Sequence, residues 1–143
     1  KIYKGFPYYT NGVTGYIGVD DVVNAMYQLL QSDYKNERYI LVSENLSFKI
    51  FQEKVSRALN VIPAKKEATS VVLAIGWRLD WLNHKVFGKR RKLSKQMATS
   101  ARSISLYDSS KLKAALNFEF QSLDDCIKNV GQLFLKDVEK EKL

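Results

Sequence analysis

The stretch from Gly15 to Val42 constrains the fold of this chain more than any other. Two acids, Asp20 and Asp21, precede a run in which apolar residues recur at helical spacing, Val22–Leu30. Carboxylates at such a place stabilise the first turn of a helix, so the sequence predicts a helix with Asp20 as its N-cap. After a polar connection, Ile40–Val42 is a continuous apolar run, which is the pattern of a strand buried on both faces. This stretch therefore predicts a strand, an amphipathic helix and a second strand.

The rest of the chain predicts further helices, each behind a polar residue that can serve as its N-cap. The expected helices are 47–59 after Ser47, 71–82 after Thr69 or Ser70, 94–101 after Ser94, 108–116 after Asp108, and 122–135 after Ser122. A brief strand is expected at 104–107, and the charged tail 136–143 is expected to fray. The fold class is therefore α/β, mostly helical with a few short strands, in a single domain over residues 1–135.

Three segments together carry a resemblance to a known family. They are Gly-Tyr-Ile-Gly-Val-Asp-Asp-Val-Val-Asn-Ala from Gly15, Glu-Arg-Tyr-Ile-Leu-Val-Ser-Glu-Asn-Leu-Ser from Glu37, and Tyr-Asp-Ser-Ser-Lys from Tyr107 with Leu-Asn-Phe-Glu-Phe from Leu116. In order and spacing they resemble the second half of the extended short-chain dehydrogenase/reductases, the NAD-dependent epimerase/dehydratase family. Gly18 and Asn117 depart from that family's usual residues. The resemblance implies the C-terminal, substrate-side part of a Rossmann-type enzyme.

The resemblance also says what this chain lacks. No Gly-x-x-Gly-x-x-Gly or Gly-x-Gly-x-x-Gly turn occurs, although such a turn holds the dinucleotide in the family. Of the eight tyrosines, only Tyr107 has a lysine four places later, Lys111, and we interpret that spacing as chance. We therefore expect no catalytic, cofactor-binding or metal-binding residue here, and no turnover by this chain alone. The expected partner is a missing N-terminal half that binds NAD or NADP.

The resemblance places the substrate pocket near the start of this chain. Its candidate residues are Tyr8, Tyr9, Thr10 and Arg102, and the expected substrate is a small molecule, a sugar nucleotide or another carbonyl or alcohol compound. Tyrosines also pack loops onto a core while their hydroxyl groups stay in water, so a purely structural role stays open for Tyr8 and Tyr9. If the missing half covers the helix after Asp20, its removal exposes an apolar face, which predicts a possible homodimer.

Positive charge is concentrated after the most apolar stretch of the chain. Residues 71–82 are too few and too charged to span a bilayer, and the basic run 85–95 follows directly. This run fits a solvated loop, a means of attracting a phosphate-bearing substrate, or a binding module for an anionic ligand, nucleic acid or membrane surface. The preferred prediction has neither nucleic acid nor membrane as a partner. A stand-alone binding or assembly module and a peripheral membrane protein that docks through 71–82 are the alternatives.

Two single residues limit the chemistry further. Cys126 is the only cysteine, which excludes an internal disulfide and a cysteine cluster for metal. With no signal-peptide pattern, it leads us to expect a cytoplasmic protein. His84 is the only histidine and has no acid, serine or cysteine at a catalytic spacing, so we expect a surface role for it.

Overall fold

The chain is a mixed α/β protein that is mostly helical with a few short strands, as the sequence predicted. The computed structural model describes residues 2–88, 90 and 94–141. Its elements in chain order are η1 (Ile2–Lys4), β1 (Tyr8–Tyr9), β2 (Val13–Tyr16), α1 (Val19–Leu30), β3 (Glu44–Ser47), α2 (Phe48–Ala58), β4 (Lys66–Glu67), α3 (Ser70–Phe87), α4 (Lys95–Ser100), α5 (Ser110–Leu116) and α6 (Leu123–Lys140).

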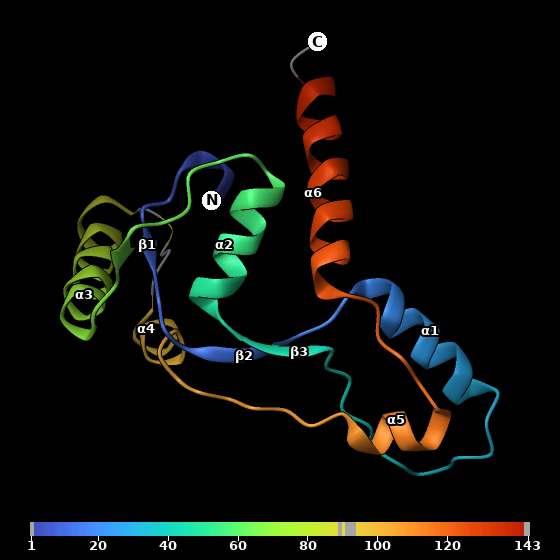
Figure 1. Ribbon diagram of the computed structural model, residues 1–143. Helices are drawn as coiled ribbons and strands as arrows, with labels where there is room; N and C mark the ends of the chain where they lie inside the picture. Colours follow the sequence, from blue (N-terminus) through green and yellow to red (C-terminus); the bar gives the residue numbers. More distant parts are fainter. Residues whose placement is uncertain (1, 89, 91–93, 142–143) are drawn as a thin grey trace.

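The strands form two small ribbons, and the helices spread away from them in different directions (Figure 1). β1 pairs in parallel with β4, and β2 pairs antiparallel with β3, where Val13 lies opposite Ser47. α2 and α6 stand side by side, α1 and α5 lie at one side of the molecule, and α3 lies at the opposite edge (Figure 1). A small core between α1 and α5 contains Ala25, Leu112 and Phe118.

Three of the predicted N-caps are confirmed. The side chains of Ser47, Thr69 and Ser94 each accept a hydrogen bond from the backbone N–H three residues later, at the starts of α2, α3 and α4. Such bonds satisfy N–H groups that have no partner within the helix, which is why the sequence signal is reliable. At the end of α2, Asn60 has the positive φ of 53° that commonly closes a helix.

The other three predicted caps are wrong in detail. α1 begins one residue before Asp20, with Gly18 as N-cap. The carboxylate of Asp21 is buried and accepts from the backbone N–H of Gln121, which joins α1 to the segment before α6. Ser122 is the N-cap residue of α6, as predicted, but its side chain makes no cap bond.

α5 begins at Ser110, with Ser109 rather than Asp108 as its N-cap. Asp108 instead accepts from the backbone N–H of Ser110 at 2.9 Å and from its hydroxyl at 2.7 Å. These bonds favour the charged carboxylate and lower the pKa of Asp108. The Ser109 hydroxyl is buried and donates to the carbonyl oxygen of Val42.

Two predicted strands are not found in the described residues. Ile40–Val42 is irregular although Val42 is buried, because β2 pairs with β3, four residues further along than expected. The 104–107 segment makes only one parallel bridge, between Ile104 and Val13. Short apolar runs show burial, but whether they become strands depends on a free edge to pair with.

α6 differs from its prediction in its length and in the burial of its apolar residues. It remains helical through Lys140, so residues 136–140 of the tail predicted to fray belong to the helix. Of the apolar residues of this helix, Leu123 is buried, whereas Val130, Leu133 and Phe134 are exposed. The same holds on α1, where Met26 and Leu30 were expected to face inward and are 61% and 88% exposed.

These exposed faces follow from an open shape. The chain exposes 10722 Å², whereas a compact protein of its mass exposes roughly 7,500 Å². The difference of about 3,000 Å² exceeds the whole area that a standard protein–protein interface buries. Several helices therefore present apolar surface that no described part of this chain covers.

Candidate functional site

Three hollows of similar volume lie between pairs of elements. One lies between α2 and α6 and has a volume of about 600 Å³. A second, of about 610 Å³, is lined by η1, α2, α6 and the segment that enters α1. A third, of about 560 Å³, lies between α3 and α4. The three differ in the chemistry of their walls, and that difference selects the candidate site.

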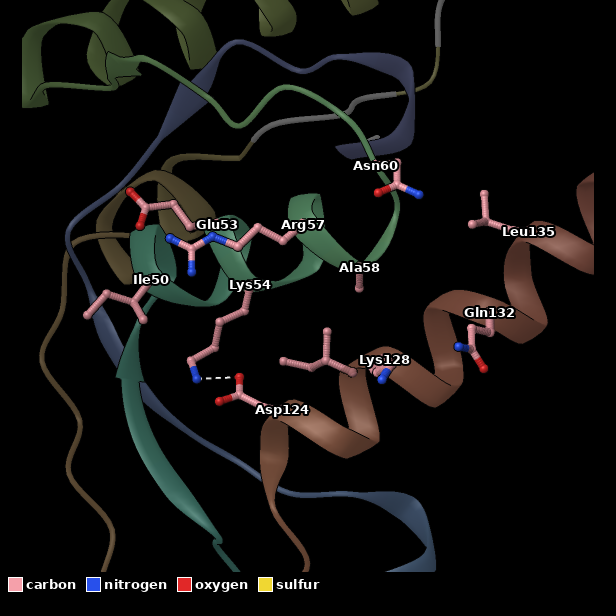
Figure 2. A pocket seen from close by; sticks show the side chains of 11 residues that line it. Ile50, Glu53, Lys54, Arg57, Ala58, Asn60, Asp124, Lys128, Gln132 and Leu135 are labelled. Carbon is pink, nitrogen blue, oxygen red and sulfur yellow. Dashed lines mark hydrogen bonds and ion pairs between the residues drawn. The ribbon is translucent and has the colours of Figure 1, made fainter.

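The α2–α6 hollow has walls of mixed charge (Figure 2). Lys54 and Asp124 form an ion pair across the gap, and Arg57 and Lys128 lie nearby with Glu53. Opposite charges on the same walls partly cancel, which weakens selection for an anion or a cation. The ion pair joins α2 to α6, so its role in this hollow is to hold the two helices together.

The second hollow is an apolar groove with one buried polar atom. The Tyr16 ring stacks on Phe51 with centroids 4.1 Å apart, and its hydroxyl is buried with no hydrogen-bond partner in the described structure. Burial raises the pKa of Tyr16. Burial is also the main cause that raises the pKa of the Cys126 thiol beside the groove, which keeps it protonated and unreactive. Neither group is activated for chemistry.

The α3–α4 cleft has walls of a single charge sign. Three cations line it, Arg78 from α3, Lys95 from α4 and Arg102 just after α4, and its lining residues include no acid. Trp77 adds an aromatic wall, and the Arg78 guanidinium lies 4.6 Å from its ring centroid. Ser70, Thr99 and Ser103 add hydroxyl groups. Guanidinium, ammonium and hydroxyl groups together suit an anion such as a phosphate.

The backbone near β2 fixes the position of Arg102. Gly12 N–H donates to Ala101 O, and Val13 N–H donates to Ser103 O at 2.9 Å, so the residues on both sides of Arg102 are held. A Cβ at Gly12 would lie 2.6 Å from Ala101 O, a contact that no side chain tolerates. Glycine is therefore required for this close approach of two backbone segments.

The predicted pocket residues are divided by the structure. Arg102 lines the α3–α4 cleft, whereas Tyr8, Tyr9 and Thr10 line none of the three hollows. Tyr8 packs edge-on against Phe6, and Lys49 lies over the Tyr9 ring at 5.0 Å. These contacts are those of residues that pack a loop, and the pocket role of Tyr8, Tyr9 and Thr10 stays a prediction.

The sequence missed Arg78, Lys95 and Trp77 as cleft residues. Arg78 and Trp77 were treated as parts of the most apolar stretch, and Lys95 as one member of the basic run. The sequence pattern that could have indicated these residues is the one-turn spacing from Leu73 and Ala74 to Trp77. That spacing defines the face of α3 that turns to α4. Within the basic run, residues 89 and 91–93 lie outside the described part of the chain.

Tyr107 and Lys111, the tyrosine–lysine pair singled out in the sequence, make separate contacts in the structure. Tyr107 is held by Asn45, whose side chain both donates to the Tyr107 carbonyl and accepts from its N–H. Lys111 pairs instead with Glu37, which is the main reason its pKa is raised, and lies 5.0 Å from the Tyr39 ring centroid. The interpretation of this spacing as chance stays a prediction.

A metal site and a membrane-spanning helix are both absent from the described ranges. Residues 2–88, 90 and 94–141 contain no group of three or more His, Cys, Asp or Glu side chains that could hold a metal ion. Within the same ranges, no helix combines the length and the apolar character that crossing a bilayer requires.

Comparisons with known proteins give a likeness of fold. No family model matches the chain, and no curated protein matches it. Among solved structures, the crystal structure of gox2253 is similar, with a TM-score of 0.71 and 19% sequence identity. The similarity covers 95% of this chain and 41% of that chain, so this chain spans less than half the length of gox2253. The likeness shows a shared fold over that part.

Proposed function

We propose that this chain is the substrate-side part of an NAD(P)-dependent oxidoreductase, epimerase or dehydratase of the extended short-chain dehydrogenase/reductase type. In this proposal a separate nucleotide-binding half supplies NAD or NADP and the catalytic groups. The sequence resemblance suggests the family, and the open shape suits a chain that packs on another half. The α3–α4 cleft is the observation that carries the proposal for substrate, because it gathers three cations and no acid.

The chemistry of the cleft favours a substrate with a phosphate group. Arg102 can donate two parallel hydrogen bonds to phosphate oxygens. Arg78, whose Nη1 donates to the Ala74 carbonyl oxygen at 2.9 Å, and Lys95 add two further positive charges. The Trp77 ring can stack on a sugar or base. A sugar nucleotide offers both groups, and it belongs to the substrate class that the resemblance implies.

A titration of the chain with UDP-glucose tests this proposal. We expect saturable binding by isothermal titration calorimetry, with NMR shifts at the backbone amides around Thr99 and Arg102. Arg102→Gln should weaken binding about tenfold, because one charge-assisted hydrogen-bond group is lost. Arg57→Gln, which removes the same charge from the α2–α6 hollow, is the matched control and should leave binding unchanged.

Two results would contradict the proposal. Equal loss with Arg57→Gln and Arg102→Gln would mean that net charge, and not the cleft, attracts the ligand. Saturable micromolar binding of NADH or NADPH would contradict the assignment of the nucleotide site to a separate half, because the chain has no Gly-rich turn. A natural reading frame that carries a Gly-rich strand-turn-helix upstream of Lys1 would support it independently.

A further inference from the structure

The face of α3 opposite the cleft is a continuous apolar stripe. Its residues recur at spacings of three and four, which places them on one side of the helix. They are Val71, Ile75, Leu79, Leu82 and Val86, with exposed fractions of 64%, 53%, 55%, 49% and 61%. None of the 18 residues of α3 is fully buried. Because Leu73, Ala74 and Trp77 turn to α4, the stripe lies on another side of the helix. α3 itself lies at the edge of the molecule (Figure 1).

One aromatic ring, Trp81, and one cation, Lys85, lie beside this stripe on α3. Lys85 lies over the Trp81 ring, with its ammonium nitrogen 5.2 Å from the ring centroid, and Trp81 is 44% exposed. Tryptophan and lysine favour the boundary between water and lipid, since the ring sits at the headgroups while the ammonium reaches outward. Both tryptophans of the chain, Trp77 and Trp81, are in α3.

The charge of the chain is concentrated in the same region. In sequence, residues 70–95 contain seven Lys and Arg residues and one acid, which accounts for six of the eight net positive charges. Four of these cations, Arg78, Lys85, Arg90 and Lys95, belong to the described part of the chain. A cluster of four to eight cations beside an amphipathic helix is the sequence pattern of binding to anionic lipids. The apolar stripe and the positive charge are therefore complementary to the two parts of such a membrane, its acyl chains and its headgroups.

We propose that α3 docks the protein on an anionic membrane surface. The helix lies in the plane of the interface, with Ile75, Leu79 and Leu82 inserted between headgroups and Lys85 at the level of the phosphates. The helix does not cross the bilayer. From sequence, a peripheral membrane protein that docks through 71–82 was an alternative to the preferred prediction of no membrane partner, and the exposed stripe favours that alternative.

Charge also argues against a second copy of this chain on the stripe. Two copies that met through α3 would bring two strongly positive regions together, and like charges that face each other across an interface oppose association. An anionic surface instead gains from the same charge. The exposed face of α1 has no such concentration of cations, since its first turn contains Asp20 and Asp21.

Vesicle sedimentation with the whole chain tests the proposal. We expect binding to vesicles of phosphatidylcholine with 30% phosphatidylserine, and at least tenfold weaker binding to phosphatidylcholine alone or in 0.5 M salt. Trp fluorescence should shift to the blue on binding, since both tryptophans are in α3. Leu79→Glu should weaken binding at least tenfold. Leu30→Glu, at an 88% exposed position on α1, is the matched control and should not.

Three outcomes would overturn the proposal. The first is no binding to the anionic vesicles, and the second is an equal loss with Leu30→Glu and Leu79→Glu. The third is a concentration-dependent dimer, seen by light scattering, that Leu79→Glu abolishes while vesicle binding is absent; that result would assign the stripe to a second copy. None of these variants alters a residue of the cleft, so UDP-glucose binding reports separately on the proposed function.

Discussion

α3 and α6 are helices of equal length, 18 residues each, in opposite environments. α6 packs against α2 and buries Leu123 and Gly131, although Val130 and Leu133 on it are exposed. α3 is the more hydrophobic helix, yet none of its residues is fully buried. In this molecule the more apolar of the two helices is therefore the less covered.

This difference shows that the hydrophobicity of a helix predicts that its apolar face will be covered. It does not predict which molecule covers that face. A helix that is apolar on most sides requires cover, and the cover can be the same chain, another chain or a lipid surface. α6 has an apolar stripe narrow enough for α2 to cover in part. α3 has one face that packs toward α4 and a second face that no described part of the chain covers.

The largest expected effect is a difference in the free energy of unfolding between two Leu→Ala variants, one on each helix. Leu123→Ala on α6 should lower the free energy of unfolding by about 3 kcal/mol, because Leu123 is 3% exposed and its removal leaves a cavity. Leu79→Ala on α3 should change it by less than about 0.5 kcal/mol, because Leu79 is 55% exposed. Urea unfolding measures both. Equal losses would mean that the α3 stripe is covered in solution.

A smaller effect is expected at the two N-caps. Thr69→Ala should cost about 1 kcal/mol, because the Thr69 side chain accepts from the Val72 N–H at the start of α3. Ser122→Ala should be close to neutral, because the Ser122 side chain makes no cap bond at the start of α6. Thermal unfolding followed by circular dichroism compares them, and the reverse ranking would contradict the observed caps.

The elements that the sequence predicted well depend on local chemistry. Ser47, Thr69 and Ser94 satisfy N–H groups three residues away, so their role follows from neighbours in the chain. The strand expected at Ile40–Val42 depended on a free edge far along the chain, and β2 pairs with a later segment instead. Local capping was therefore predictable, whereas pairing was not.

The candidate site shows the same division. Arg102 was a candidate from sequence, but the sequence did not predict that Arg78 and Lys95 lie near it. Their proximity depends on how α3 packs against α4. The exposed faces of α1 and α3 were unpredictable for a related reason. Periodicity marks which residues share a face, and only the tertiary structure tells whether anything lies against that face.

The smallest expected effect concerns the ion pair between Lys54 and Asp124, which joins α2 to α6 (Figure 2). Asp124 is largely exposed, so solvent screens the pair, and Asp124→Asn should cost only about 0.5 kcal/mol more than Asp125→Asn at low salt. Asp125 is the matched control because it lies in the same first turn of α6 and no ion pair is observed for it in the described structure. Both variants lose the favourable interaction of an acid with the helix dipole, so their difference isolates the ion pair.

Salt provides the second arm of this experiment. In 1 M NaCl the screening length falls to about 3 Å, and the difference between Asp124→Asn and Asp125→Asn should shrink toward zero. Adding Lys54→Met should remove the excess cost of Asp124→Asn at low salt, because the partner charge is then absent. An excess that persists in both conditions would mean that Asp124 stabilises α6 by another contact.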